Sequence, residues 1–415
     1  MAKNTTSNNI AFVFDDLTEF YAMREVIDLL YEQKKHLDIV VPYDSGYNGM
    51  AQHTLSSIKK MGYSPKKDFP KNKKYKVLLT PYPNIQGVER ANYTYHLRFP
   101  YSTISAKPNP VYTPDAKIDY DGIICFNYYE PQFLPAYGTE CFSVPYWKYY
   151  KNHKTTTKGK PTLLILPTFG QDTSCVQLLT KTFINQLQKH FDIIIKAHHA
   201  IHFNIDGKSS LNSLKSLNVK LYNSDTPITE LLQQSDLVLS DNSGSIFEAI
   251  YSDTPVATLS ADLNARHLGP IDTLQYRLAK EDILPHASNP KNILPLLLNI
   301  NSYFIKQQTI KSVLFPKVKQ KQPKEFVSII DHYLLKDEQN DYRKVLHKLL
   351  VQERNYLKKQ ANQVPQLLTE NAILKQYKEE AEKVFNSKAY KLFDKTIKPL
   401  KAIRSKARKG AVNEK

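Results

Sequence analysis

The chain has 415 residues, of which 57 are Lys or Arg and 40 are Asp or Glu, so its formal net charge at pH 7 is +17. Because 41% of its residues are hydrophobic, it has enough apolar material for folded cores, which excludes a wholly disordered chain. Its 12 glycines form no GxGxxG and no GxxxxGK[ST] motif, so two common phosphate-binding fingerprints are excluded as well.

The cysteines and the N-terminus indicate the cellular compartment of the protein. Cys125, Cys141 and Cys175 are far apart and form no CxxC, which is typical of a reducing cytosol rather than of a disulfide scaffold. Residues 1–9 are polar and lack the apolar core of a signal peptide, and no stretch approaches the ~18 apolar residues of a membrane-spanning helix. We therefore expect a cytoplasmic protein whose contact with a membrane is peripheral.

Buried-looking strands and amphipathic helices alternate along the first part of the chain. Phe20, Met23, Val26, Ile27 and Leu30 have the spacing of a helix. Apolar runs predict strands at 10–14, 37–41, 76–80 and 120–126. Strand, helix and strand in this order predict βαβ units and a parallel sheet, whereas residues 81–119, rich in Pro, Tyr and Asn, predict an irregular loop.

The same pattern resumes after residues 149–160, a polar, basic stretch that we interpret as a linker. Helices are predicted at 176–187, 227–234 and 246–251. Strands are predicted at 162–166, 191–196, 219–222, 237–240 and 255–259. The fold class is therefore α/β, with two doubly wound domains whose strand ends face a cleft, where ligands of such sheets bind.

The domain limits follow from these shifts in composition. We predict an N-terminal α/β domain at 1–150, a second α/β domain at 151–330 and a helical extension at 331–415 that ends in a basic tail.

The segment from Ser235 to Ile250 combines a buried strand, a tight polar turn and the start of a helix. Ser243, Gly244 and Ser245 at this turn would offer backbone N–H groups to a diphosphate, and Glu248 would accept hydrogen bonds from ribose hydroxyls. Ser245 with Glu248 also fits S-x-x-E, a capping box that merely begins a helix, so both interpretations stay open.

A second polar segment follows the predicted strand at 191–196. Lys196 and His198 would lie at the carboxyl edge of the second sheet, where a cation meets a phosphate. A metal pair formed by His198 and His202 is the alternative, but no HExxH motif accompanies them, and we predict no metal.

These segments together resemble the CDP-glycerol glycerophosphotransferase family, the teichoic-acid primases and polymerases of Gram-positive bacteria. The resemblance depends on the order of Pro167-Thr168, Lys196-Ala197-His198, the stretch 235–248 and Thr254-Pro255-Val256, which is similar to the family's PT, KxHP, SDxxITDYSSxxFE/D and KPV motifs. Residues 120–124 and 144–146 resemble the family's YDxxxV and GxP more weakly.

The resemblance implies a GT-B fold, in which two Rossmann-like domains face each other across a cleft, and a donor nucleotide held by the second domain without metal or other cofactor. It implies that glycerol phosphate moves from CDP-glycerol to a lipid-linked acceptor during synthesis of teichoic acid or a related cell-surface or capsule polymer, with release of CMP. The residues that match the donor positions are Thr168, Lys196, His198, Ser243, Gly244, Ser245 and Glu248.

The chain departs from the family at several positions. His199 stands where KxHP has proline, and the turn 242–245 differs in sequence and length. The family's N-terminal His-Gly, whose histidine is the probable base, is absent. In the segment 96–107, which takes its place, His96 and Tyr101 are the candidate substitutes, and a missing base, with His96 an ordinary loop histidine, stays open. His198 is the other candidate catalytic residue. Two alternatives stay open: a UDP-sugar enzyme similar to UDP-GlcNAc 2-epimerases, and a catalytically silent GT-B partner subunit.

The C-terminal tail holds much of the positive charge. Residues 383–415 contain eleven Lys or Arg against two acidic residues, and apolar residues recur among them at helical spacing. This pattern predicts a basic amphipathic helix on the anionic inner face of the cell membrane, and it disfavours nucleic acid as a partner. Residues 337–385 predict a preceding helix, for which a coiled-coil-like stalk and a contact in a homo-oligomer are both open interpretations. The predicted membrane-binding residues are Lys388, Lys391, Lys395, Lys398, Lys401 and Arg404.

Overall fold

The computed structural model divides the chain into two compact units, Met1–Arg266 with Thr273–Glu353, and His267–Asp272 with Arg354–Lys415. All the helices and strands given below belong to the first unit, and of the second unit only Tyr356 is described. The structure describes residues 9–42, 49–70, 73–82, 92–104, 120–132, 139–150, 159–168, 174–203, 205–223, 225–263, 273–336, 345, 349, 352–353 and 356.

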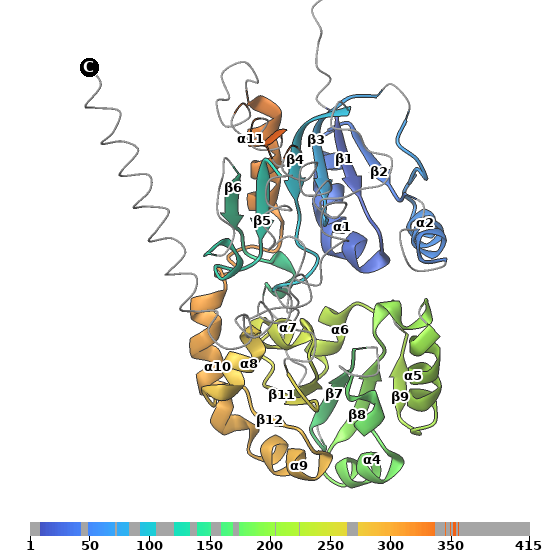
Figure 1. Ribbon diagram of the computed structural model, residues 1–415, viewed down its shortest axis with the longest axis vertical. Helices are drawn as coiled ribbons and strands as arrows, with labels where there is room; N and C mark the ends of the chain where they lie inside the picture. Colours follow the sequence, from blue (N-terminus) through green and yellow to red (C-terminus); the bar gives the residue numbers. More distant parts are fainter. Residues whose placement is uncertain are drawn as a thin grey trace, which may run out of the picture. The chain divides into compact units, whose positions relative to one another are not determined.

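The first sheet contains six strands in the order β2-β1-β3-β4-β5-β6, all paired in parallel (Figure 1). Strand β1 is a continuous apolar run, and both β1 and β3 are buried along their whole length, as is typical of parallel sheets. The strands are β1 (Ile10–Val13), β2 (Leu37–Val40), β3 (Tyr75–Thr80), β4 (Tyr93–Arg98), β5 (Gly122–Cys125) and β6 (Glu140–Ser143).

Strand β4 corrects the prediction of an irregular loop at 81–119. Its sequence, YTYHLR, is rich in polar side chains, and its tyrosines and threonine favour a strand only once neighbouring strands cover them. β3 and β5 supply that cover, so that Tyr95, His96, Leu97 and Arg98 are all buried. The sequence pattern alone did not separate this strand from its loop-like surroundings.

Helices surround the first sheet, and one of them arrives from the far end of the chain. These helices are α1 (Leu17–Glu32), α2 (Met50–Lys60), the short η3 (Glu130–Gln132) and η4 (Trp147–Tyr149), and α11 (Lys324–Leu335). Helix α11 follows the second sheet in sequence yet packs on β3 and α1 of the first. The boundary predicted at residue 330 lies inside this helix.

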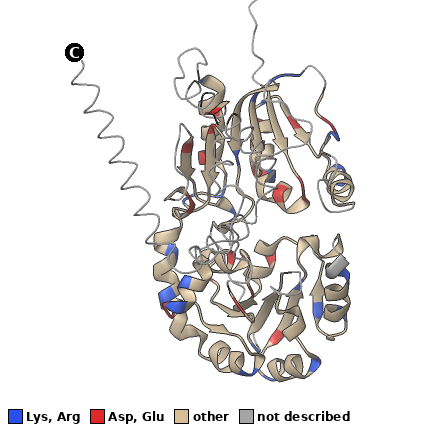
Figure 2. Ribbon diagram, in the orientation of Figure 1, with Lys and Arg blue, Asp and Glu red and all other residues tan. Residues whose placement is uncertain are grey.

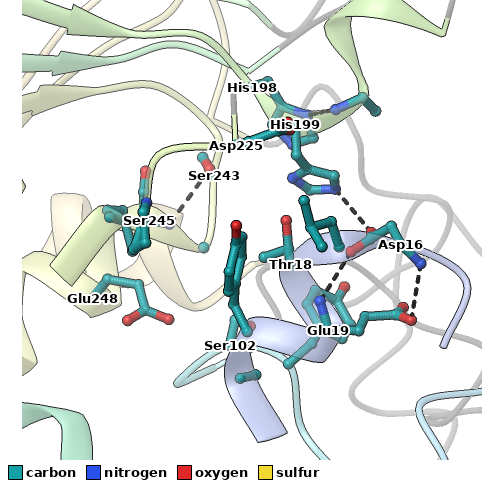
Figure 3. Close-up of a pocket in the computed structure, with 18 of the residues that line it drawn as sticks. Asp16, Thr18, Glu19, Ser102, His198, His199, Asp225, Ser243, Ser245 and Glu248 are labelled. Atoms are coloured by element: carbon teal, nitrogen blue, oxygen red, sulfur yellow. Dashed lines mark hydrogen bonds and ion pairs between the residues drawn. The ribbon is translucent and has the colours of Figure 1, made fainter. Parts of the chain in front are cut away.

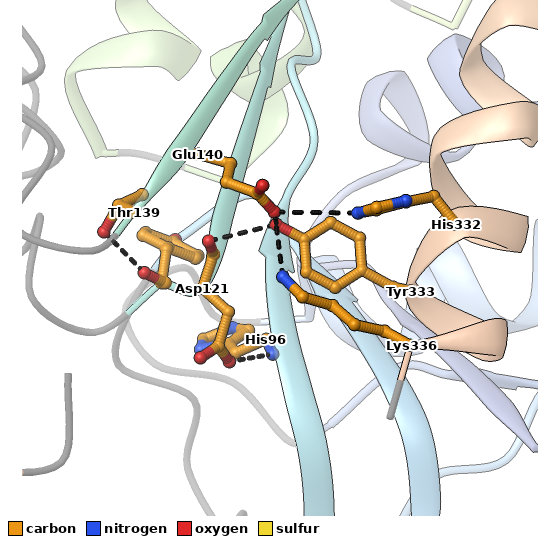
Figure 4. Close-up of polar contacts among 8 residues, drawn as sticks. His96, Asp121, Thr139, Glu140, His332, Tyr333 and Lys336 are labelled. Atoms are coloured by element: carbon orange, nitrogen blue, oxygen red, sulfur yellow. Dashed lines mark hydrogen bonds and ion pairs between the residues drawn. The ribbon is translucent and has the colours of Figure 1, made fainter. Parts of the chain in front are cut away.

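Polar contacts anchor α11 to the edge of the first sheet (Figure 4). The hydroxyl oxygen of Tyr333 lies 2.6 Å from Oε2 of Glu140 and 3.1 Å from the carbonyl oxygen of Asp121, and Lys336 Nζ lies 3.1 Å from the same Glu140 oxygen. A Cβ at position 122 would stand 2.6 Å from the Tyr333 hydroxyl, so Gly122 is what permits this close approach.

The second sheet also has six parallel strands, in the order β12-β11-β10-β7-β8-β9. Counted from its own first strand and read from β9, the order is 3-2-1-4-5-6, that of doubly wound dinucleotide-binding sheets. The strands are β7 (Thr162–Leu166), β8 (Asp192–Lys196), β9 (Lys220–Tyr222), β10 (Leu237–Ser240), β11 (Val256–Leu259) and β12 (His286–Ala287).

The three helices predicted for the second half are present, one of them divided in two, and further helices that were not predicted accompany them. The stretch 176–187 forms two elements instead of one, because the Thr180 hydroxyl accepts a hydrogen bond from Phe183 N and so begins a new helix. The helices are η5 (Cys175–Leu178), α4 (Lys181–Gln188), η6 (His199–His202), α5 (Ile205–Lys215), α6 (Ile228–Gln233), α7 (Ser245–Tyr251), α8 (Leu274–Lys280), α9 (Pro290–Leu298) and α10 (Ile300–Leu314).

Charged residues are spread over the outer helices of the described part (Figure 2). On α10, Lys306 and Lys311 form ion pairs with Asp282 and Asp253. No helix within the described ranges is long and apolar enough to cross a membrane. The basic tail predicted to contact the membrane, with Lys388 and the other residues named for it, lies outside the described residues.

Candidate functional site

A cavity of about 420 Å³ opens where the carboxyl ends of the two sheets meet (Figure 3). Each sheet contributes the point at which its strand order reverses, between β1 and β3 in the first and between β7 and β10 in the second. Doubly wound sheets bind ligands at these reversal points, and the volume is in the range of small-molecule sites. The second half lines one side with Thr168, Lys196, His198, Ser243, Gly244, Ser245 and Glu248.

Asp241 holds the second reversal point together. It follows β10 directly, is fully buried, and its Oδ2 accepts hydrogen bonds from Thr168 N at 2.8 Å and from Cys175 N at 3.0 Å. One carboxylate therefore ties the end of β10 to the end of β7 and to the segment before η5. This arrangement positions Thr168 and the turn 242–244 at the wall of the cavity.

The turn after β10 presents small side chains to the cavity. Ser243, Gly244 and Ser245 are partly exposed and line it. The capping-box interpretation of Ser245 and Glu248 is wrong, because Gly244 is the N-cap of α7 and no side chain caps this helix. Ser245 instead shares a hydrogen bond of 2.7 Å between its Oγ and that of Ser240, and its backbone N donates to Ser243 Oγ at 3.4 Å.

Lys196 is the last residue of β8 and His198 comes two residues later, and both line the cavity. Burial lowers the pKa of the Lys196 ammonium to about 8, although Asp225 and Asp16 oppose this effect. His198 Nδ1 accepts a hydrogen bond from Ala200 N at 3.2 Å, so its neutral ring carries the proton on Nε2. The sequence-predicted donor residues thus meet on one wall.

Glu248 also lines this wall, but its described contacts come from the first half of the chain. Its Oε1 accepts from Thr103 N at 2.9 Å, and its Oε2 accepts from the Tyr149 hydroxyl. Burial raises the pKa of Glu248 to about 7, although the Thr103 N–H and Lys148 oppose the shift. These contacts link α7 to the loops of the first sheet, whereas contact with a ribose stays a prediction.

The raised pKa of Glu248 predicts a pH-dependent stability. Because the fold favours the protonated carboxyl, its contribution is complete below about pH 4.5 and is lost as pH rises through about 7, a loss of roughly 3 kcal/mol. Glu248→Gln keeps a neutral acceptor for Thr103 N and should escape this loss. Urea unfolding measures the free energy of unfolding of both proteins at about pH 5 and about pH 8. Between these values the variant should lose less stability than the parent protein. A difference in stability independent of pH would contradict the assignment.

The opposite wall comes from the start of α1. Asp16 is the N-cap: its Oδ1 accepts from Glu19 N at 3.0 Å, and Glu19 Oε2 accepts from Asp16 N at 3.3 Å, which makes a capping box. Phe14 and Phe20 pack edge to face at 5.5 Å and fix the first turn. Asp16 and Glu19 line the cavity and were not singled out from the sequence. Two acidic residues directly after the first predicted strand were the available signal.

His96 lies away from this cavity. It is in β4, only 2% exposed, with Nε2 2.8 Å from Thr80 Oγ1 and its ring packed against Tyr93 and Tyr120. It is absent from the lining residues, so the candidate base chosen from the sequence is a core histidine that does not reach a substrate there. Residues 105–107 of its segment lie outside the described ranges.

Metal ligation is not indicated at the cavity. Within the part of the chain that the structure describes, no three His, Cys, Asp or Glu side chains are grouped as metal ligands. His202, considered beside His198 as a metal pair, is exposed and does not line the cavity.

Solved structures share this architecture at low sequence identity. A variant of the wall teichoic acid polymerase TagF matches with a TM-score of 0.54 and 12% identity, covering 80% of this chain and 89% of that one. A second TagF variant matches with a TM-score of 0.53 and 11% identity over the same shares. UDP-GlcNAc 2-epimerase from Neisseria meningitidis matches with a TM-score of 0.47 and 13% identity, covering 79% of this chain and all of that one. The two TagF matches show that the fold is GT-B, as predicted.

The family resemblance is confirmed for the second half. Residues 148–270 match the family model of CDP-Glycerol:Poly(glycerophosphate) glycerophosphotransferase. No curated protein sequence matches the chain. The matched stretch contains every residue of the second-half wall that the sequence had singled out.

Proposed function

We propose that the protein is a transferase that moves glycerol phosphate from CDP-glycerol to a lipid-linked acceptor in the synthesis of teichoic acid or a related cell-surface polymer. The observation that supports it most is the coincidence of the family match at 148–270 with one wall of the cavity. That wall combines two serine hydroxyls after β10, at the strand-order reversal where doubly wound sheets hold nucleotides, with a lysine and a ring N–H at the end of the nearby strand β8.

The same wall suits the electrostatics of phosphoryl transfer. As CMP leaves, negative charge grows on the phosphate oxygen that bridged it to the transferred group, and preorganised donors stabilise that charge. Lys196 supplies a positive charge, His198 an Nε2–H, and Ser243 and Ser245 hydroxyl groups. The carboxyl groups at the start of α1 lie on the opposite wall, and those of Asp225 and Glu248 line the cavity from the second half (Figure 3).

A thermal-shift panel tests the donor. CDP-glycerol should raise the melting temperature more than CDP does, because a ligand at 100 times its Kd stabilises the fold by about 2.7 kcal/mol. CDP-ribitol, UDP and UDP-sugars complete the panel. Stabilisation by uridine compounds alone would replace this proposal with the UDP-sugar alternative, and no response to any nucleotide would favour a catalytically silent partner subunit.

The basic tail is the proposed membrane contact of this enzyme, which would bring the cavity to a lipid-linked acceptor on the inner face of the membrane. Removal of residues 383–415 should abolish co-sedimentation with vesicles containing phosphatidylglycerol, since juxtamembrane cations contribute about 1 kcal/mol each. The truncated protein should still respond to CDP-glycerol in the thermal-shift panel. Undiminished vesicle binding after truncation would refute the role of the tail.

A further inference from the structure

His199 lies across the cavity from the first-half wall and contacts it. It is the first residue of η6, shortly after β8, and its Nε2 lies 3.2 Å from Oδ2 of Asp16, the N-cap of α1 (Figure 3). Both side chains line the cavity and both are largely buried, with exposed fractions of 28% for His199 and 13% for Asp16. The pair joins the carboxyl edges of the two sheets: Asp16 follows β1 and His199 follows β8, the neighbour of β7.

The two carboxylate oxygens of Asp16 contact different groups. Oδ1 caps α1 by accepting from Glu19 N, which leaves Oδ2 directed at the imidazole. Burial alone would raise the pKa of Asp16, but His199 and the N–H groups of Thr18 and Glu19 bring it below its ordinary value. A carboxylate only accepts hydrogen bonds, so Nε2 of His199, which faces it, carries a proton, and Nδ1 is the ring nitrogen that can take up another.

The neighbouring histidine has the opposite chemistry. The rings of His198 and His199 stack with centroids 4.1 Å apart. His198 accepts the Ala200 N–H through Nδ1, so it offers an N–H to the cavity. Of the two adjacent imidazoles, His198 is therefore a hydrogen-bond donor and His199 a proton acceptor.

Charged groups from every neighbouring element face this pair. Asp15 and Glu19 come from the start of α1, Lys196 from β8, and Asp225 from the loop after β9. Burial raises the pKa of Glu19 well above its ordinary value, and Asp16 and Asp15 add to the effect. Glu19 accepts hydrogen bonds from the backbone N–H groups of Asp15 and Asp16, so the carboxyl group that contacts the imidazole is that of Asp16.

We propose that His199 is the general base that takes the proton of the acceptor hydroxyl, and that Asp16 is the positioning residue that orients it. This assignment rests on the proposed function. Carboxylate, imidazole and hydroxyl in this order are the arrangement by which enzymes activate a weak oxygen nucleophile.

The transfer forms one bond to phosphorus and breaks another, and it moves one proton. The acceptor oxygen forms a bond to the glycerol-bearing phosphorus while its proton passes to Nδ1 of His199. The bond from that phosphorus to the bridging oxygen breaks, and CMP leaves with the electron pair. The imidazolium then releases its proton to solvent, since CMP leaves as a phosphate that needs no proton at neutral pH.

His199→Gln and Asp16→Asn test the assignment in the full-length protein. Asparagine is a strong N-cap, so Asp16→Asn keeps the cap of α1 while it removes the charge that faces His199. The control is His202→Gln, which removes an exposed imidazole of the same short helix from outside the cavity. CMP release in single turnover, with decyl glycerol phosphate as the acceptor, reports the chemical step, and calorimetry with CDP-glycerol reports donor binding.

We expect His199→Gln to slow CMP release by roughly 10²- to 10⁴-fold with the Kd for CDP-glycerol unchanged. Asp16→Asn should slow CMP release less than His199→Gln does, and Asp16→Glu should restore part of the lost rate. His202→Gln should release CMP at the rate of the parent protein. An unslowed His199→Gln, or one whose defect is confined to the Kd, would overturn the base assignment alone. A parent protein that neither binds CDP-glycerol nor releases CMP would overturn the proposed function, and the base with it.

Discussion

Replacement of Lys196 by methionine should weaken the binding of CDP-glycerol by roughly 10- to 100-fold, because a hydrogen bond to a charged group contributes about 1.5–3 kcal/mol. Methionine retains an unbranched apolar side chain at the end of β8 and removes only the ammonium group. The fold should not be destabilised, since burial already disfavours the charged form and lowers the pKa of this lysine to about 8.

The pH dependence of binding gives a second readout of the same residue. Below pH 8 the ammonium is charged and attracts the diphosphate, and above it the amine is neutral, so the affinity of the parent should decline as pH rises through about 8. Lys196→Met should show no such decline. Lys215→Met, on an exposed position of α5, is the matched control and should bind as the parent does. Equal affinity of Lys196→Met and the parent would contradict the placement of the phosphates.

Replacement of Asp241 by alanine should destabilise the fold by about 3–5 kcal/mol, a large part of the 5–15 kcal/mol typical of a folded domain. The change leaves the buried N–H groups of Thr168 and Cys175 without the acceptor they share. Because the turn at Ser243 and the end of β7 depend on this carboxylate, the affinity for CDP-glycerol should fall as well.

Asp236 offers a matched control at the other end of the same strand pair. Its Oδ2 accepts from Thr162 N at 2.8 Å where β7 and β10 begin, far along these strands from the cavity. Asp236→Ala should cost about 1–2 kcal/mol, because it removes one part-buried hydrogen bond, and should leave nucleotide affinity intact. Urea unfolding and calorimetry measure both effects, and equal destabilisation by the two variants would contradict the central role of Asp241.

The strands of both sheets were largely predictable because several of them are continuous or nearly continuous apolar runs. β1, β7 and β10 are nearly or completely buried on both faces, and this burial leaves a local signature in the sequence. β4 left no such signature, since four of its six residues are Tyr, Thr or His, and their burial depends on the strands beside it. The short α4 began one turn later than predicted because a single threonine hydroxyl capped it.

One wall of the cavity was predictable and the other was not. Lys196, His198 and the turn Ser243–Ser245 each follow a strand, and all strand ends of a parallel sheet face the same edge, so local patterns placed them together. His96 was chosen from its place in the chain, yet β4 carries it into the core. Asp16 gave only a weak signal, because the first-half wall becomes visible only when the two sheets face each other.

By itself, then, the sequence determined the alternation of strands and helices, the two parallel sheets and the chemistry of the donor wall. These depend on hydrophobic periodicity and on residues that directly follow strands, both of which are local properties. The tertiary structure alone decided the return of α11 to the first sheet, the bracing of Glu248 by Thr103 and Tyr149, and the meeting of Asp16 with His199. Each of these joins residues that are far apart along the chain, and such contacts arise from packing between elements, which no local pattern records.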